Sequence, residues 1–252
     1  MAKGYVEHKY RTWSVFKSDI ARDISGDAVF PFGKYVFRGQ TKAEWGLVSN
    51  FDRTFSRYRG EEKRRIENNL LDGFKARYKI QNPELNIESV EKQRITALGQ
   101  HYGLPTRLLD WTYSVYIASF FAFADTNCQI EHDPTHVAIW IADKENAIWS
   151  DDVKFIEESS MRDNVRQTIQ KGLFIQNNSR FETIEEYIEL TMDISENEMP
   201  LYKAIIPASE RASALKDLHM MGIDYYSIYG GLEGCAKAAV MDEMLKLMNN
   251  NN

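Results

Sequence analysis

The chain has few cysteines and no long apolar segment. Only two cysteines, Cys128 and Cys235, occur among 252 residues, and they lie far apart in the sequence. Their small number excludes a disulfide framework and a cysteine-type zinc site, and it favours a reducing, cytoplasmic location. The richest apolar stretch, residues 115–124, is shorter than a membrane span, and the N-terminus lacks the apolar run of a secretory signal. We therefore expect no association with a membrane.

The chain also lacks an excess of positive charge. Lys and Arg number 31 against 37 Asp and Glu, which gives a formal net charge of −6. No general electrostatic attraction draws such a protein to nucleic acid, so we do not expect nucleic acid as a partner. A local basic segment at residues 53–65 is typical of a solvated helix face. The content of 43% hydrophobic and 12% aromatic residues is that of a globular protein.

Several common motifs of nucleotide-binding and hydrolytic enzymes are missing. The sequence has no G-x-x-x-x-G-K-[ST] loop, no G-x-G-x-x-G and no G-x-S-x-G. His132 and His136 have the four-residue spacing of metal ligands on a helix, but Asp133-Pro134 interrupts that helix. We therefore expect no metal site, while nucleotide binding by another kind of loop stays open.

Helical and strand patterns are mixed along the chain. Apolar spacing predicts helices over residues 8–24, 53–85, 87–102, 113–125, 183–190, 209–221 and 232–248, with Thr112 as an N-cap. Runs of β-branched and aromatic residues predict strands over residues 34–40, 135–142, 201–206 and 225–229, and a turn followed by a strand over 166–175. This pattern predicts an α+β fold in which helices cover a mixed, mostly antiparallel sheet of short strands.

We expect one domain, because the chain shows neither a repeat nor a linker. The domain spans residues 1–248 with a helical N-terminal part, and residues 249–252 form a disordered polar tail. The expected core includes Leu108, Leu109, Ile117, Phe120, Phe121, Ile139 and Ile205.

Residues 99–112 are the densest group of potentially functional side chains. Pro105 breaks any helix through this stretch, and Gly103 can end a helix that arrives from the N-terminal side. The polar and aromatic candidates around this turn are His101, Tyr102, Thr106, Arg107, Asp110 and Trp111. Two interpretations are open: a functional cleft, which we favour, and a buried turn held by an Arg107–Asp110 pair.

A second candidate lies at the end of the predicted strand 34–40. Arg38 is followed by Gly39, which allows a partner to approach closely. An arginine in this position can bind a phosphate, or it can be an edge residue paired with a carboxylate, and spacing does not decide between them. We expect Arg38 to lie in or beside the same cleft as His101, Thr106 and Trp111.

Residues 101–112, HYGLPTRLLDWT, resemble the central motif of the FRG domain family. The family is named for the tripeptide found here at residues 37–39, and Gln40, Trp45 and Leu47 extend the match. Further similarity at residues 118–122, 222–223 and 231–234 makes the resemblance span about residues 13–237. The family is defined by sequence and largely lacks an assigned activity, so the resemblance implies a domain type rather than a reaction.

Parts of the same segments are similar to ADP-ribosyltransferases of the Arg–Ser–Glu class, whose arginine holds the phosphates of NAD. Arg38 would match that arginine, residues 111–114 the turn beside the nicotinamide, and residues 118–122 the following helix. Gln170 stands where the class carries a glutamate, and it cannot stabilise a developing positive charge as a carboxylate does. The resemblance implies an ADP-ribosyltransferase-like fold, NAD as cofactor, and Arg38, Thr112 and Gln170 as catalytic residues.

These observations give two functional hypotheses. In the first, Arg38, Gln170 and residues 101–112 form the pocket of an ADP-ribosyl-transferring or NAD-cleaving enzyme in a bacterial or phage stress or defence system, with Asp110 and Glu233 as the nearest acids. In the second, which the glutamine favours, the pocket is a non-catalytic module that binds a nucleotide-like ligand or a protein partner. The ligand-binding candidates are Gln40, His101, Tyr102, Thr106, Arg107, Asp110 and Trp111. A third interpretation makes both motifs structural, with their arginines tying strand to turn through Asp110.

Overall fold

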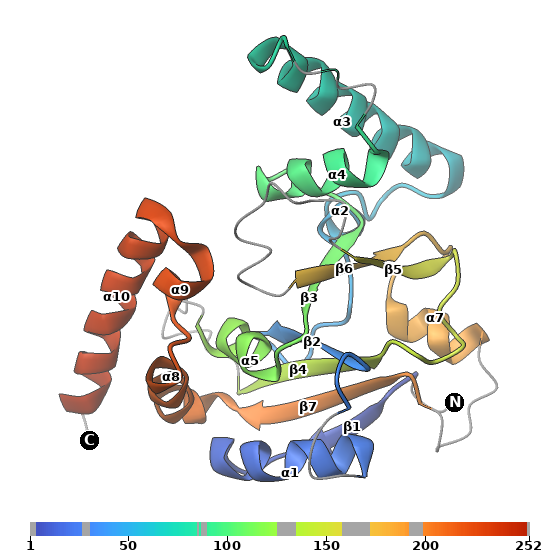
Figure 1. Ribbon diagram of the computed structural model, residues 1–252. Helices are drawn as coiled ribbons and strands as arrows, with labels where there is room; N and C mark the ends of the chain where they lie inside the picture. Colours follow the sequence, from blue (N-terminus) through green and yellow to red (C-terminus); the bar gives the residue numbers. More distant parts are fainter. Residues whose placement is uncertain are drawn as a thin grey trace.

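The computed structural model describes residues 4–26, 31–84, 86, 90–124, 135–157, 172–191 and 199–250. The strands of this part form one seven-stranded sheet in the order β1-β7-β4-β2-β3-β6-β5. They are β1 Val6–Lys9, β2 Tyr35–Gln40, β3 Leu108–Thr112, β4 His136–Asp143, β5 Val153–Glu157, β6 Gly172–Asn177 and β7 Leu201–Pro207. The β1–β7 pair is parallel and the other described pairs are antiparallel. This confirms the predicted α+β class with a mixed, mostly antiparallel sheet (Figure 1).

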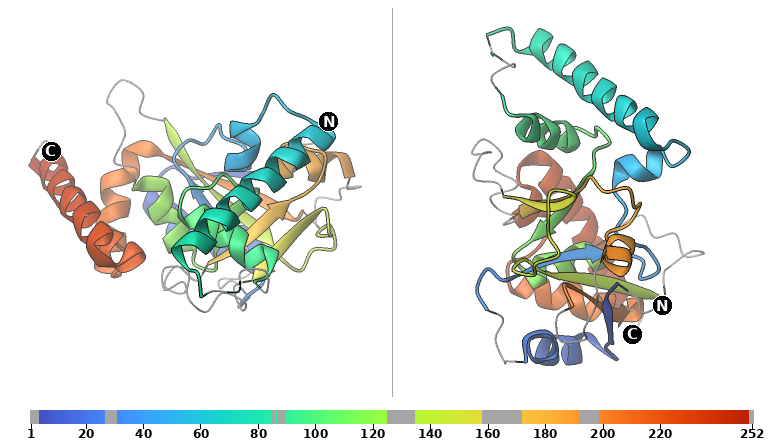
Figure 2. Two further views of the ribbon diagram at one scale, coloured as in Figure 1. Left: turned by 90° about the horizontal axis from the view of Figure 1, so that it is seen from above. Right: turned by 90° about the vertical axis from the view of Figure 1, so that its right-hand side faces the viewer.

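Helices cover both faces and one end of the sheet (Figures 1 and 2). They are α1 Trp13–Ser25, α2 Asn50–Thr54, α3 Gly60–Gln81, α4 Lys92–His101, α5 Val115–Phe123, α7 Ile184–Thr191, α8 Arg211–Met220, α9 Tyr225–Tyr229 and α10 Gly231–Asn250. Helices α1, α5 and α8 share one core, and α7 closes another. Helices α3 and α4 form a layer beyond β3, β5 and β6, at the end of the molecule away from α1 (Figure 2). No helix in the described part is long and apolar enough to cross a membrane.

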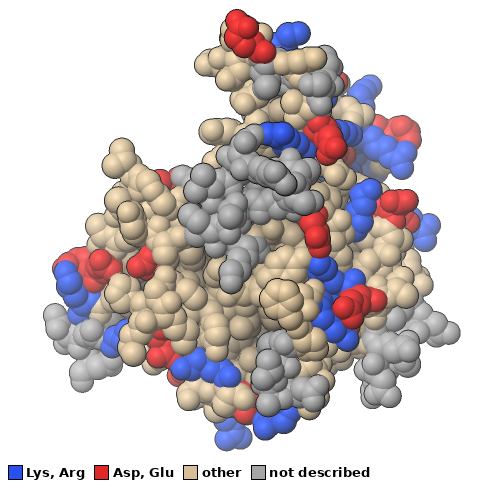
Figure 3. Space-filling model, in the orientation of Figure 1, with Lys and Arg blue, Asp and Glu red and all other residues tan. Residues whose placement is uncertain are grey.

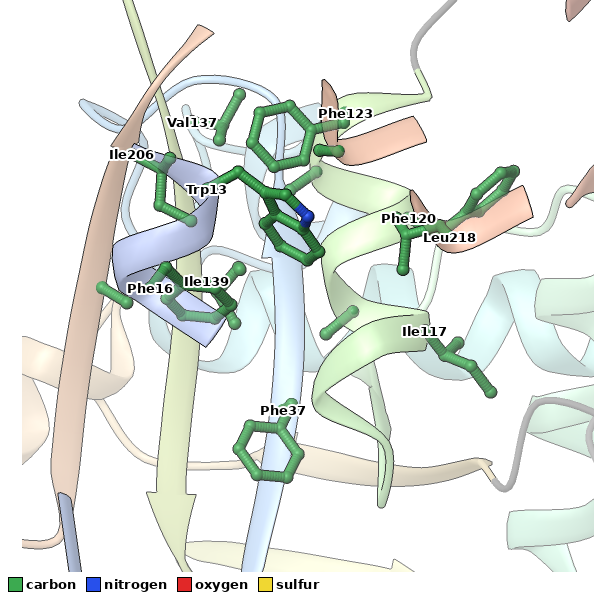
Figure 4. Close-up of a cluster of buried hydrophobic side chains, with 14 of the residues drawn as sticks. Trp13, Phe16, Phe37, Ile117, Phe120, Phe123, Val137, Ile139, Ile206 and Leu218 are labelled. Atoms are coloured by element: carbon green, nitrogen blue, oxygen red, sulfur yellow. The ribbon is translucent and has the colours of Figure 1, made fainter. Parts of the chain in front are cut away.

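The main core lies between α1, α5 and one face of the sheet. Trp13 and Phe16 of α1 pack in one cluster with Phe123 of α5 and with Phe37 and Ile139 of the strands (Figure 4). Residues of the opposite strand face form a second core, which includes Val36, Leu109, Trp111, Trp140, Ile184 and Ile188. Burial on both faces explains why apolar residues stand next to each other in the central strands, as in the apolar run of β4.

Most of the predicted core is confirmed. The buried members are Leu108, Leu109, Ile117, Phe120 and Ile139. Phe121 and Ile205 are only half-buried, so these two predictions are wrong. Phe121 lines a cleft, and Ile205 lies on the strand face opposite to that of the buried Ile206.

Gly39 allows α5 to pack directly on β2. A Cβ atom at this position would lie 1.9 Å from the carbonyl oxygen of Ala118 and 2.7 Å from the nitrogen of Ala122. These distances are far below van der Waals contact, so no side chain fits between the two backbones. The glycine of the FRG tripeptide therefore sets the spacing between α5 and β2.

Two segments differ from the predicted secondary structure. Residues 6–9 form β1 beside β7, so the first helix begins at Trp13 instead of residue 8. Residues 225–229 form helix α9 instead of a strand, because Asp224 and Ser227 make a reciprocal capping box at its start. In both places hydrogen bonds outweigh the apolar spacing used for the prediction: a long-range strand pairing for β1 and a local cap for α9.

Two further strands were not predicted, and the start of α5 is shifted as well. β3 lies inside the central motif and is buried on both faces except at Asp110, so it lacks the alternation that identifies a strand. β5 lies in a segment for which the sequence predicts neither a helix nor a strand. Helix α5 begins at Val115 because the Ser114 hydroxyl accepts the backbone N–H of Ile117, so Thr112 is not its N-cap. The predicted turn at residues 166–171 lies outside the described residues. The backbone of residues 249–250 continues α10.

Candidate functional site

A cleft opens where β2 and β3 diverge. The two strands share a single paired position, Phe37 with Thr112, and from there β2 continues along β4 and β3 along β6. The cleft between them has a volume of about 570 Å³. Its walls come from β2, β3, α4 and α5, and residues of α9 and α10 complete it. Its polar lining includes Arg38, Thr41, Arg53, Gln100, His101, Asp110 and Glu233.

Arg38 bridges the two diverging strands. Its Nη1 donates a hydrogen bond of 2.7 Å to the carbonyl oxygen of Asp110 and lies 3.9 Å from Oδ2 of the same residue. The guanidinium thus substitutes for the backbone pairing that the strands lose beyond Phe37. Burial lowers the pKa of Arg38 and Asp110 opposes this shift, but an arginine remains charged at neutral pH. The buried Nε has no hydrogen-bond partner among the residues that the structure describes, so these residues do not saturate this cation.

Asp110 presents its carboxyl group to the cleft. Its side chain is 68% exposed, and its Oδ1 accepts a hydrogen bond of 2.9 Å from Nε2 of Gln100. The protein atoms around the group take it partly out of solvent and so raise the pKa of Asp110, while Arg38 opposes the shift. An acid with a raised pKa beside a cation in a cleft is typical of a functional site.

A hydrogen-bond chain orients this carboxyl group. The Thr106 hydroxyl donates to Oε1 of Gln100, which leaves the amide nitrogen of Gln100 directed at Asp110. Thr106 is only 4% exposed, and its Oγ1 also accepts the backbone N–H of Leu108 at 3.2 Å. Thr106 therefore acts on the cleft through Gln100 and does not line it.

Replacing Thr106 with valine is expected to raise the pKa of Asp110. Valine has a similar shape but cannot donate to Gln100, so the hydrogen bond that stabilises the ionised carboxylate is released. The N–H of Leu108 also loses its acceptor, which costs about 1–3 kcal/mol of unfolding free energy. Titration of the Asp110 carboxyl carbon by 13C NMR measures the pKa, and Thr106→Ser, which keeps the hydroxyl, should match the wild type. An unchanged pKa of Asp110 in Thr106→Val would contradict the hydrogen-bond chain from Thr106 through Gln100 to Asp110.

Aromatic side chains line the rest of the cleft. Trp45 is 41% exposed, while Phe121 and Tyr229 contribute from α5 and α9. Trp111 also lines the cleft, but it is only 3% exposed and belongs to the second core. Stacking on a base or nicotinamide ring needs an accessible aromatic face. Trp45, and not the predicted Trp111, supplies that face.

The loop after β2 is anchored by two buried side chains. Nε2 of Gln40 donates to the carbonyl oxygen of Gly46 at 3.1 Å, and its Oε1 accepts the indole N–H of Trp140 at 2.7 Å. The carboxylate of Glu185 accepts the backbone N–H of Leu47 with both oxygens, at 3.0 and 3.1 Å. The amide of Gln40 is thus engaged with the protein at both ends, so its role in the geometry is to hold this loop.

The structure brings six of the ten predicted site residues to this cleft. They are Arg38, Gln40, His101, Asp110, Trp111 and Thr112. Thr106 lies beside this cleft, hydrogen-bonded to Gln100, and it lines a separate cavity at the start of β3 together with Arg107, so the structure does not show a single pocket formed by all of residues 101–112. Tyr102 is 70% exposed and lines neither cavity. Gln170 lies outside the described residues.

Arg107 does not pair with Asp110, contrary to one of the two interpretations of the central turn. Its Nε donates to Glu67 at 2.8 Å, and its Nη1 lies 3.6 Å from Oδ1 of Asp52. Arg38 is the arginine beside Asp110 instead. Glu67 lies 40 positions before Arg107, and no local spacing in the sequence identifies such a partner.

Three functional groups of the cleft were missing from the predicted site. Gln100 directly precedes His101 and lies in the last turn of α4, where Ala97 also lines the cleft. Its place next to a predicted site residue was the feature of the sequence that could have identified it. Arg53 had been assigned to a solvated helix face, but it lines the cleft. Glu233, noted only as a nearby acid, lines the cleft with its carboxylate 2.9 Å from Nζ of Lys237.

The cleft offers three kinds of functional group: the guanidinium of Arg38, the carboxyl group of Asp110 and the accessible indole of Trp45. Arginine binds phosphate oxygens through charge-assisted hydrogen bonds, and a carboxyl group can accept or donate a proton. No group of three or more His, Cys, Asp or Glu in the described part of the chain could hold a metal ion.

Comparison with known proteins supports one of the two resemblances. Residues 33–130 match the family model of the FRG domain, which supports the assignment of this segment to that family. The segment contains Arg38, Gln100 and Asp110, and therefore the polar centre of the cleft. No curated protein and no solved structure match the chain. The comparisons give no support to the resemblance to ADP-ribosyltransferases.

Proposed function

We propose that the cleft between β2 and β3 binds a nucleotide of the NAD type. The observation that carries this proposal is the Arg38–Asp110 pair at the polar centre of the cleft, an unsaturated cation beside an accessible carboxyl group. In this arrangement Arg38 binds the phosphates and Trp45 stacks on a ring. The volume of about 570 Å³ is in the usual range for small-molecule pockets.

We further propose that Asp110 is the acid of an NAD-cleaving or ADP-ribosyl-transferring reaction. Cleavage of the nicotinamide–ribose bond releases nicotinamide with the bonding electron pair and leaves positive charge on the ribose. A carboxylate beside that carbon stabilises the charge, and it can accept the proton of the water or hydroxyl group that adds there. In the described part of the chain, Asp110 and Glu233 are the acids that line the cleft, and Asp110 is the one next to Arg38.

The alternative is a binding module without chemistry. Asp110 is already held by Gln100 and Arg38, and Gln170 stands where the transferase class carries its glutamate. In this alternative the same cleft recognises a nucleotide-like ligand, and Asp110 serves only to position Arg38.

Calorimetric titration with NAD and ADP-ribose, combined with an assay for released nicotinamide, separates these functions. We expect both compounds to bind, and we expect Asp110→Asn to lower nicotinamide release at least about 100-fold, as the loss of a general acid–base group does, while NAD still binds. Asp151→Asn removes a fully exposed carboxylate elsewhere and should change neither quantity. Binding without turnover would favour the module, and failure of both compounds to bind would refute the proposed ligand.

A further inference from the structure

A second and larger cavity lies at the start of β3. It has a volume of about 930 Å³ and is enclosed by the first half of α3, by α4, by β5 and β6, and by the loop at residues 178–182. Thr106 and Arg107 of the central motif line this cavity, whereas Asp110 and Thr112 line the first cleft. The function proposed above leaves this cavity without a role.

The cavity is basic in a protein that is acidic as a whole. Seven Lys and Arg side chains line it against four Asp and Glu, an excess of three positive charges in a chain of net charge −6. Figure 3 shows basic and acidic side chains intermixed over the α3 side of the molecule. A concave surface with a local excess of positive charge concentrates anions.

The buried cations form the floor and are neutralised by the protein. The side chains of Lys63 and Arg107 are 8% and 10% exposed, and they share the carboxylate of Asp52, with Glu67 as a further partner of Arg107. These groups cannot leave their partners without exposing a buried charge, so they are structural.

The cations at the rim are more exposed than those of the floor, although Arg59 also donates to the carbonyl oxygens of Ser56 and Tyr58. Arg59 and Arg64 pair with Glu182 and Glu61, but all four side chains are at least 44% exposed, and such pairs contribute little stability. Lys154 lies 3.5 Å from a fully exposed carboxylate.

Arg180 is the rim cation best suited to bind an anion. Its guanidinium lies over the ring of Phe181, 4.9 Å from the centroid, and it makes no ion pair with a described residue. Helix α3 also begins at this rim, at Gly60, without a side-chain cap, so its first N–H groups add to the positive potential.

An aliphatic wall faces these charges. It is formed by the partly exposed Leu70, Leu104 and Pro105, which lie over the buried Leu71, Leu108 and Ile156. We propose that the cavity is a second ligand site, which binds an organic phosphate: the rim cations bind the phosphate groups, and the wall covers the less polar part. This site does not depend on the function of the first cleft, since Arg38 does not line it.

Titration with pyrophosphate and with ADP tests the second site. We expect both to bind in low salt, ADP more tightly because only ADP has a part that can cover the wall. The double variant Lys154→Gln/Arg180→Gln should weaken pyrophosphate binding at least tenfold. Arg65→Gln removes an exposed arginine that does not line the cavity, and it should have no effect.

Hydrogen exchange locates the bound probe. Pyrophosphate should slow exchange at residues 59–64 and 178–182, in wild type and in Arg38→Ala alike. Binding that survives Lys154→Gln/Arg180→Gln but disappears in Arg38→Ala would place the phosphates in the first cleft and refute the second site. Failure of both probes to bind the wild type would refute it as well.

Discussion

Arg38→Ala is expected to weaken NAD binding at least about 100-fold while the protein remains folded. A guanidinium that binds phosphate through two charge-assisted hydrogen bonds contributes about 3 kcal/mol or more to binding, and alanine supplies neither the charge nor the donors. Calorimetric titration with NAD measures the change. Arg38→Lys keeps the charge without the planar fork, so its affinity should fall between those of the wild type and the alanine variant.

The stability of the same variant decides between a ligand-binding and a structural arginine. Removing Arg38 leaves the Asp110 carbonyl without its hydrogen bond, but the Asp110 carboxylate is 68% exposed and does not become a buried unpaired charge. We therefore expect a loss of about 1–2 kcal/mol of unfolding free energy, below the 3–5 kcal/mol that accompanies a broken buried pair. Arg22→Ala, at an exposed arginine of α1, is the matched control for both measurements. Unchanged NAD affinity together with a loss of about 5 kcal/mol of unfolding free energy would show that the role of Arg38 is structural.

The sequence predicts the elements whose apolar pattern is regular. β2 and β4 are found near their predicted positions, and so are α7 and β7. β1 has the sequence Val-Glu-His-Lys at residues 6–9 and forms only because β7, almost 200 residues later, pairs with it. α9 has the aromatic composition of a strand, and Asp224 makes it helical. In each case the deciding contact is absent from a pattern of apolar residues.

The candidate site is predictable only where the motif itself supplies both partners. Arg38 and Asp110 are both motif residues, and their contact across 72 positions agrees with the interpretation in which an arginine ties strand to turn. The interpretation that pairs Arg107 with Asp110 was wrong, because the partners of Arg107 lie on α2 and α3, outside the motif. A short motif can therefore line two cavities. The residues at the start of β3 line the second cavity, and the residues toward its end line the first cleft.

Asp52→Asn is expected to cause the largest loss of stability of the variants considered. The Asp52 carboxylate is 3% exposed and lies 2.8 Å from Nζ of Lys63 and 3.6 Å from Nη1 of Arg107, and it accepts the Ser49 hydroxyl at 2.6 Å. Asparagine keeps the size but removes the charge, so Lys63 is left as a buried cation without a counter-ion. Loss of one partner in such a group costs about 3–5 kcal/mol of unfolding free energy, measured by urea denaturation.

Glu61→Gln supplies the control for this prediction, because it removes a carboxylate from an exposed pair on the same helix as Lys63. Glu61 and Arg64 are 89% and 70% exposed, so the expected loss is at most about 1 kcal/mol. If Asp52→Asn cost no more than Glu61→Gln, solvent would have to reach Lys63, and the cluster would not be the floor of the second cavity. A large loss confined to Asp52→Asn would show that Arg107 is held at the start of β3 by a buried charge cluster. The position of the strand that carries Asp110 then depends on α2 and α3 as well as on its partners in the sheet.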